Sequence, residues 1–408
     1  MSGAVQTVLV VLLIVSLIGL VAVLNGLRPI RFTPLQLPAF FAAWLTVELA
    51  PQLIVVTSVV LLICVLLSAW SAVGVLCVNL AVLLWMVVQA ERAAHVADAA
   101  LSEWVEPVEQ QHAPRLLRRF FVPMAFGDPA VERIADVRFS EESSRLKLDV
   151  YVAKDRPVNG PTLLQVHGGG WVTGNKEEQG RPLMLHLAKQ GWVCFAPNYR
   201  LSPRATWPDH LVDVKRAIAW VREHGHEYGA DPGFLVLTGG SAGGHLTALC
   251  AMTQNDPSYQ PGFEGADTSV QGCIPYYGVY DIAAETGTTA AKVRKRVLLA
   301  RRVMKTRDPE VYKQASPLAQ VNDSVPPFLV IHGRNDTLVP VQEARELVRR
   351  LREVSKQPVL YLELPGTQHA FDVFPSIRSD HVVRAVGRFC QFLRVSRHQP
   401  ATGDQRQI

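Results

Sequence analysis

Residues 239–243 read Gly239-Gly240-Ser241-Ala242-Gly243, which is the pattern G-x-S-x-G. The apolar run 234–238 before this stretch is typical of a buried strand, and the run 245–250 after it is typical of a helix. A serine in this context sits on a sharp strand-to-helix turn that projects its hydroxyl from the edge of a sheet. Small residues must flank it, because the turn leaves no room for side chains. The stretch therefore predicts a nucleophilic Ser241, with Gly239 and Gly243 as the glycines of the turn.

A second glycine-rich stretch, His167-Gly168-Gly169-Gly170, directly follows the apolar run 163–166. A serine that attacks a carbonyl creates an oxyanion, which needs fixed N–H donors. Glycines allow the backbone close approach and conformations that other residues avoid. We expect the N–H groups of Gly169, Gly170 and Ala242 to form this oxyanion hole, with each donor lowering the barrier by about 3 kcal/mol.

Two further strand-like runs, 327–331 and 359–364, lead into loops that carry Asp336 and His369. The carboxyl ends of parallel strands meet at one edge of an open α/β sheet, so these loops converge on the loop of the serine. We expect a triad in which Ser241 attacks the carbonyl and His369 moves the proton. Asp336 orients the imidazole and stabilises its charged form.

Two residues near these loops offer alternatives to the triad. Asp372 lies in the same loop as His369 and is a rival acid, but such a close neighbour seldom reaches the far ring nitrogen. His332 precedes the loop of Asp336, and we expect it to be structural.

From about Pro114 to Leu393 the chain resembles the hormone-sensitive-lipase-like branch of the α/β-hydrolase superfamily, which includes bacterial carboxylesterases and lipases. One departure is Gly240, where that branch usually carries Asp; this makes the chain also similar to the neighbouring formamidase and feruloyl-esterase-like hydrolases. The resemblance implies an α/β-hydrolase fold, a mostly parallel central sheet with helices on both faces. It also implies hydrolysis of carboxylic esters through an acyl-enzyme. We expect neither a cofactor nor a metal. The matching motifs are His167 to Gly170, Gly239 to Gly244, Asp336 with Val339-Pro340, and His369.

The N-terminal region is strongly apolar. Residues 1–27 and 49–90 carry no charged side chain, and each transmembrane helix needs about 20 such residues. We expect three spans, near 7–27, 52–69 and 71–90, with the segment 40–44 lying at the interface or lengthening the second span. A signal peptide followed by a buried hairpin is the alternative, but the first residues offer no basic side chain.

These observations divide the chain into a transmembrane helical region (1–90), a connector (91–114), a catalytic domain (115–397) and a disordered tail (398–408). We expect an integral protein of the cell membrane. Arg28 and Arg31 would place the first loop in the cytoplasm, and three spans would return the catalytic domain to that side. A span count that differs by one reverses this result, so the side stays open.

The leading hypothesis is a membrane-anchored serine esterase or lipase acting on lipid or small-molecule esters. An amidase or formamidase with the same triad, and a non-catalytic membrane scaffold, are the alternatives. A net charge of +5 without a nucleic-acid motif argues against nucleic-acid partners, and the six cysteines show no spacing typical of a zinc site. The sequence indicates no oligomeric state. Residues 292–307 carry eight basic residues and no acid, which predicts either a solvated helix face or a basic cap resting on anionic lipid.

Overall fold

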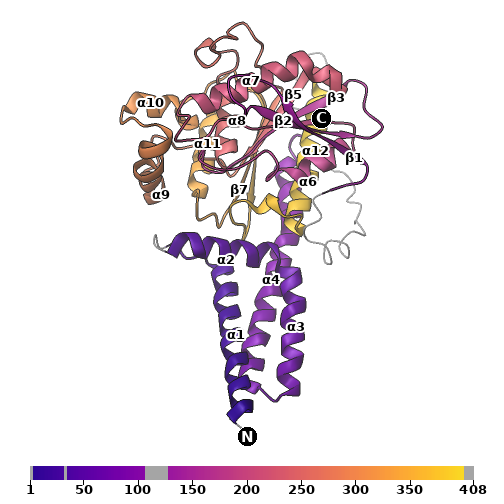
Figure 1. Cartoon of the computed structure of the whole chain (residues 1–408), viewed down its shortest axis with the longest axis vertical. Helices are drawn as coiled ribbons and strands as arrows, with labels where there is room; N and C mark the ends of the chain where they lie inside the picture. The colour runs from indigo at the N-terminus through magenta and orange to yellow at the C-terminus, as the bar shows by residue number, and fades with distance from the viewer. Residues whose placement is uncertain (1–2, 32–34, 106–126, 399–408) are drawn as a thin grey trace.

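The protein is described by a computed structural model that covers residues 3–31, 35–105 and 127–398. Part of the expected connector and the expected tail beyond His398 lie outside these residues. A bundle of apolar helices extends from one end of an α/β unit, with the N-terminus at the far end of the bundle (Figure 1). The helices of this first part are α1 (Gly3–Leu27), α2 (Gln36–Glu48), α3 (Ala50–Leu66) and α4 (Trp70–Leu101).

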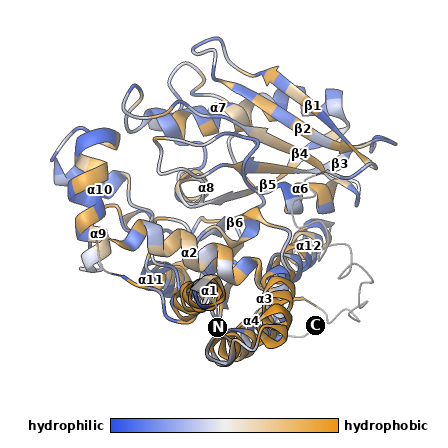
Figure 2. Cartoon of the chain, turned by 60° about the horizontal axis from the view of Figure 1, so that its bottom comes forward, coloured by the Kyte–Doolittle hydropathy of each residue, from blue (hydrophilic) through white to orange (hydrophobic). Residues whose placement is uncertain are grey.

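Helices α1, α3 and α4 consist largely of hydrophobic residues, as the colouring of Figure 2 shows, and many of their apolar side chains are exposed. By length and composition, α1 and α4 are each able to cross a membrane, and the α2–α3 pair is a third candidate if it counts as one span. This pair is bent by 85°. Pro51 in the first turn of α3 fits a helix start at this place, because it lacks the N–H that a continuous helix would need. Helix α2 therefore does not lengthen α3 as a straight span.

The α/β unit is built on one eight-stranded sheet in the order β1-β2-β4-β3-β5-β6-β7-β8. Strands β1, β2 and β4 pair antiparallel, and the strands from β4 through β3 to β8 pair parallel. This mostly parallel sheet with helices on both faces confirms the predicted fold class. The strands are β1 (Val131–Arg138), β2 (Lys147–Ala153), β3 (Gly160–Val166), β4 (Val193–Pro197), β5 (Ala230–Gly240), β6 (Gly272–Tyr276), β7 (Phe328–Gly333) and β8 (Val359–Leu364).

The first strand, β1, starts at Val131 and is irregular. Its pairing with β2 shifts between Ile134 and Val137, and Asp136 has a positive φ of 59°. This bulge interrupts the alternation of side chains and hides the first half of the strand from pattern analysis.

Helices cover both faces of the sheet and enclose one hydrophobic core on each. Helices α7, α8 and α11 contribute to the first core, and α6, α12 and the end of α4 contribute to the second. Ala93, Ala97 and Leu101 of α4 are buried in this second core, so α4 joins the bundle to the α/β unit without a break. The helices are α6 (Arg181–Ala188), α7 (Asp209–His224), α8 (Ala242–Met252), α9 (Thr289–Arg294), α10 (Pro309–Gln314), α11 (Val341–Val354) and α12 (Ile377–His398).

Candidate active site

Ser241 lies between β5 and α8, at the turn that the sequence predicted. Its backbone has φ 58° and ψ −118°, a conformation that non-glycine residues rarely adopt. The flanking glycines are needed for packing, because a Cβ on Gly243 would lie 2.1 Å from the Val166 carbonyl oxygen. A Cβ on Gly239 would lie 2.7 Å from the same oxygen. Both glycines of the turn thus approach the end of β3 too closely to carry a side chain.

The second glycine motif lies beside the serine. A Cβ on Gly168 would be 3.0 Å from the Ser241 Cβ, while Gly169 and Gly170 have positive φ angles of 108° and 59°. The Gly168 N–H donates to Gln179 Oε1 at 2.7 Å. Among the described residues, the N–H groups of Gly169, Gly170 and Ala242 have no hydrogen-bond acceptor. Three unpaired donors next to a serine are what an oxyanion hole requires.

The ring of His167, the first residue of that motif, is buried against a tyrosine. It stacks on Tyr199 with 4.4 Å between centroids, and its Nδ1 lies 2.7 Å from the Gly168 carbonyl oxygen. Burial lowers the pKa of His167 to about 4, so the ring is neutral at ordinary pH. It fixes the shape of the glycine loop.

Asp336 and His369 meet across the loops that follow β7 and β8. The His369 Nδ1 lies 2.6 Å from Asp336 Oδ2. The other carboxylate oxygen accepts the backbone N–H groups of Leu338 and Val339, each at 2.8 Å. Burial would raise the pKa of Asp336, but the charge of His369 and the hydrogen bonds from His332 and His369 outweigh burial and hold it below its usual range. The carboxylate therefore stays ionised and can orient the imidazole.

In the described part of the chain, the Ser241 hydroxyl and His369 are not hydrogen-bonded to each other. Catalytic hydrogen bonds are often loose in proteins without bound substrate. The two residues share neighbours: Tyr277 lies 4.5 Å from His369 between ring centroids, and a Cβ on Gly240 would lie 2.7 Å from the Tyr277 hydroxyl. The Tyr277 ring thus leaves no room for a side chain at position 240. This accounts for a glycine where hormone-sensitive-lipase-like enzymes usually carry Asp.

Several residues around His369 were not found by sequence reasoning. Tyr277 donates a hydrogen bond to Asp372, so the rival acid is bound to a tyrosine and not to the histidine. Gln368 Oε1 accepts the N–H of Thr337 and the N–H of His369, each at 3.2 Å, and so joins the two loops. His332 is buried, and its Nε2 lies 3.0 Å from the Val339 carbonyl oxygen and 3.4 Å from Asp336 Oδ2. The sequence offered one hint of these contacts, namely polar residues next to Asp336 and His369.

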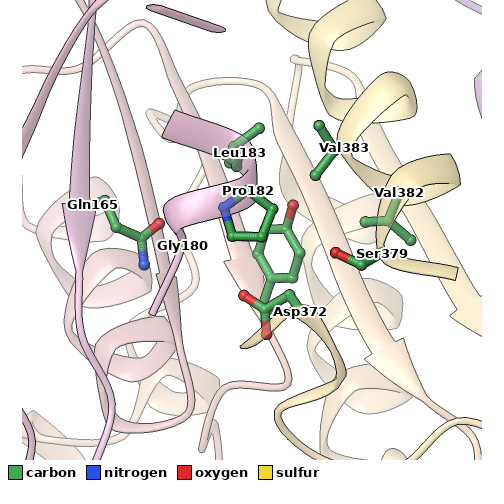
Figure 3. A pocket seen from close by; sticks show the side chains of 9 residues that line it. Gln165, Gly180, Pro182, Leu183, Asp372, Ser379, Val382 and Val383 are labelled. Carbon is green, nitrogen blue, oxygen red and sulfur yellow. The ribbon is translucent and has the colours of Figure 1, made fainter. Parts of the chain in front are cut away.

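A narrow cavity lies behind the His369 loop, between α6 and α12 (Figure 3). Gln165, Leu183, Asp372 and Ser379 are among the residues that line it, and Ser241 is not. The Ser379 hydroxyl is buried there and has no hydrogen-bond partner in the part of the chain that the structure describes. This cavity is therefore separate from the place where a substrate carbonyl would meet the serine. Among the described residues no group of three or more His, Cys, Asp or Glu is arranged to hold a metal.

A cap covers the glycine loop from another side. It consists of α9 and the π-helical stretch Lys295–Val303. A Cβ on Gly170 would lie 3.7 Å from Leu298 of this cap. Arg294 ties the cap to the α/β unit through an ion pair with the buried Glu343 at 2.7 Å. The site therefore lies between the cap and the loops of Asp336 and His369.

Comparison with known proteins identifies similar sequences and folds. The family model BD-FAE matches residues 148–351. The chain is 51% identical over 268 residues to a probable carboxylic ester hydrolase, LipM, of Mycobacterium tuberculosis, across 64% of this chain and 62% of LipM. It is 41% identical over 320 residues to the esterase LipQ of the same organism, across 74% of this chain and 75% of LipQ. The match thus spans less than two thirds of LipM.

Among solved structures, the chain is similar to native Est2, a thermophilic esterase from Thermogutta terrifontis. The TM-score is 0.53 and the sequence identity is 25%, with 69% of this chain and 97% of Est2 covered.

Proposed function

The chain belongs to the BD-FAE family of α/β-hydrolase esterases, and we propose that it is a membrane-anchored carboxylic ester hydrolase with Ser241 as its nucleophile. The observation that carries the proposal is the 2.6 Å contact of His369 with the ionised Asp336, on loops beside the serine turn. The esterase names of LipM and LipQ support the same bond type.

The reaction has two halves. In the first, the Ser241 oxygen attacks the ester carbonyl carbon while His369 Nε2 takes the hydroxyl proton. The negative charge on the carbonyl oxygen is held by the N–H groups of Gly169, Gly170 and Ala242, and Asp336 stabilises the imidazolium. Collapse of this intermediate breaks the bond to the alcohol oxygen, which receives the proton from His369 and leaves as the free alcohol.

In the second half, His369 takes a proton from water and the resulting hydroxide attacks the acyl-enzyme. The carboxylic acid is released and the proton returns to Ser241, so that one ester and one water give one acid and one alcohol. We also propose that the chain is related to the hormone-sensitive-lipase-like branch of these hydrolases.

Membrane anchoring is supported by the exposed apolar bundle. The uncharged part of α4, residues 70–90, is about 30 Å long, which matches the hydrocarbon thickness of a bilayer. If the bent α2–α3 pair counts as one crossing beside α1 and α4, three crossings would put the catalytic unit on the same side as Arg28 and Arg31.

The experiment that tests the proposed function measures covalent labelling and turnover together. A fluorophosphonate probe is expected to label the full-length protein at Ser241, and Ser241→Ala is expected to lose both labelling and hydrolysis of p-nitrophenyl esters. Matched amides of the same acyl groups test the amidase alternative. Hydrolysis that survives Ser241→Ala, or the absence of any labelling in the folded protein, would overturn the assignment.

A further inference from the structure

Helix α2 lies across the end of the membrane bundle and covers the catalytic loops (Figures 1 and 2). Near its start, the Gln36 side chain donates to the Thr337 carbonyl oxygen, next to Asp336. Near its end, the Trp44 indole donates to the Ala370 carbonyl oxygen at 3.0 Å, next to His369. Between these bonds, Phe40 meets the His369 ring edge-on with 6.4 Å between centroids. One helix thus contacts both loops that carry the acid and the base.

The neighbouring face of α2, beside Phe40 and Trp44, is apolar and exposed. Leu37, Phe41 and Leu45 recur every four residues and so lie on one face, with 56%, 48% and 41% of their surface exposed. Val47 of the same helix is buried in a cluster with Val23 of α1 and Met86 of α4. The exposed stripe of α2 therefore lies on a helix that is packed directly onto the bundle.

The charges on α4 locate the boundary of the membrane at the level of α2. Residues 70–90 are uncharged, and Glu91 and Arg92 follow within two helical turns of Met86. The Arg92 guanidinium lies 5.2 Å from the centre of the Trp85 ring, an arrangement that suits the membrane–water interface. Since Val47 of α2 packs with Met86, α2 lies close to this change from uncharged to charged residues.

We propose that α2 is an interfacial helix that forms the wall between the bilayer and His369, and that the enzyme therefore takes esters that reside in the bilayer. This inference rests on the proposed function and adds the substrate class. The acyl chain of such an ester stays in the lipid while the carbonyl reaches Ser241 past α2. Phe40 contacts the catalytic histidine from the wall, and the stripe of Leu37, Phe41 and Leu45 contacts lipid.

The position of α2 is tested without activity. Cys77 is the exposed cysteine on α4, and the other five are buried, so a Cys77→Ser background permits labelling at a chosen site. Leu37→Cys carries an environment-sensitive fluorophore in phosphatidylcholine vesicles that contain brominated lipid. Val158→Cys, 96% exposed on the α/β unit, is the matched control. We expect strong quenching at position 37 and none at position 158. Equal, weak quenching at both positions, repeated with Leu45→Cys, would overturn the inference.

The substrate class is tested with two esters on the full chain in phosphatidylcholine vesicles. One is 4-methylumbelliferyl oleate within the bilayer, and the other is p-nitrophenyl acetate in water. We expect Leu37→Gln/Leu45→Gln to lower the rate on the oleate by about tenfold, because the glutamine side chains no longer hold α2 in the lipid. The rate on the acetate should stay within about twofold of the wild-type rate. The control Val354→Gln/Val395→Gln alters exposed apolar residues of the α/β unit and should change neither rate.

The outcomes separate this inference from the proposed function. Ser241→Ala should abolish both rates, and activity that survives it would overturn the function itself. A different outcome is that Ser241 is required while Leu37→Gln/Leu45→Gln lowers both rates equally or lowers neither. In that case the hydrolase assignment stands, and the inference that the substrate comes from the bilayer is wrong.

Discussion

The rings of Tyr277 and His369 lie 4.5 Å apart between centroids, and the hydroxyl of the same tyrosine donates a hydrogen bond to Asp372. The tyrosine also fills the space next to Gly240, beside the proposed nucleophile Ser241. It therefore connects the serine turn with the histidine loop, and it holds the second carboxylate away from the imidazole. We regard it as a positioning residue, because it acts on the reaction through His369.

Tyr277→Phe is expected to destabilise the protein and to weaken catalysis moderately. The buried Asp372 loses its hydroxyl donor, and an unpaired buried polar group costs about 1–3 kcal/mol. Thermal unfolding in detergent measures the loss of stability, and kcat on a soluble ester measures the effect on His369. Tyr276→Phe is the control, because this adjacent buried tyrosine has no hydroxyl hydrogen bond among the described residues. Equal stability of both variants would contradict the role of the Tyr277 hydroxyl.

The two carboxylates near His369 are expected to differ sharply in their effect on kcat. Asp336→Asn removes the charge that stabilises the imidazolium, and analogous changes in serine hydrolases lower kcat by about 10⁴-fold. Asp372→Asn keeps a hydrogen-bond acceptor for Tyr277, and we expect a loss below about tenfold. Comparable losses in kcat from the two variants would show that the acid has been assigned wrongly.

The fold was predictable because its signals are local. Ser241 sits in a five-residue pattern, and the loops of Asp336 and His369 each follow a recognisable strand, so the parallel sheet and the convergence of these loops follow from the chain order. The contacts of Tyr277, Gln368 and His332 depend on how loops far apart in sequence approach one another, which no local pattern encodes. Helix α2 is a similar case. Its composition indicated an interfacial or spanning segment, but only the bend at α3 and the contacts of Phe40 and Trp44 distinguish the two.

Stability is expected to fall as the pH drops from about 6.5 to about 4. Burial lowers the pKa of His210 to about 4 and that of His245 to about 3, as it does for His167. The unfolded chain binds protons in this range that the folded protein excludes, so the stabilisation is complete above pH 6.5 and is lost as the pH falls through the folded pKa values. For His210 the shift corresponds to about 3 kcal/mol.

Unfolding temperatures measured from pH 7 to pH 4 check this dependence. His210→Gln should reduce the fall in unfolding temperature, while His226→Gln, which changes an exposed histidine, should leave it unchanged. An identical pH dependence in wild type and His210→Gln would show that this residue does not contribute.

The basic cap is expected to increase activity on anionic vesicles. Arg296, Arg301, Arg302 and Arg307 are exposed, whereas Arg294, Lys295 and Lys305 are held by hydrogen bonds within the protein. Each basic residue near an anionic surface contributes about 1 kcal/mol. Changing the four exposed arginines to Gln should lower the rate on an ester in phosphatidylglycerol vesicles by at least about tenfold at low salt.

Two controls accompany this prediction. The rate on a soluble short-chain ester should stay constant, and the difference on vesicles should disappear at high salt because salt screens exposed charges. Equal losses on the soluble and the vesicle-bound ester would favour the simpler hypothesis of a solvated helix face.

The ion pair of Glu48 with Arg378 is expected to fix α2 to the catalytic unit. The two side chains lie 2.6 Å apart and are 0% and 1% exposed, and Ser376 donates a further hydrogen bond to Glu48. Glu48→Gln leaves the guanidinium buried without its counter-charge, which costs about 3–5 kcal/mol. The double change Glu48→Leu/Arg378→Leu removes both charges and should recover most of this loss, since a well-packed apolar pair is often as stable as a buried ion pair. Thermal unfolding of the single and double variants in the same detergent measures the difference. A double variant that is as unstable as Glu48→Gln would mean that the pair matters through shape and not through charge.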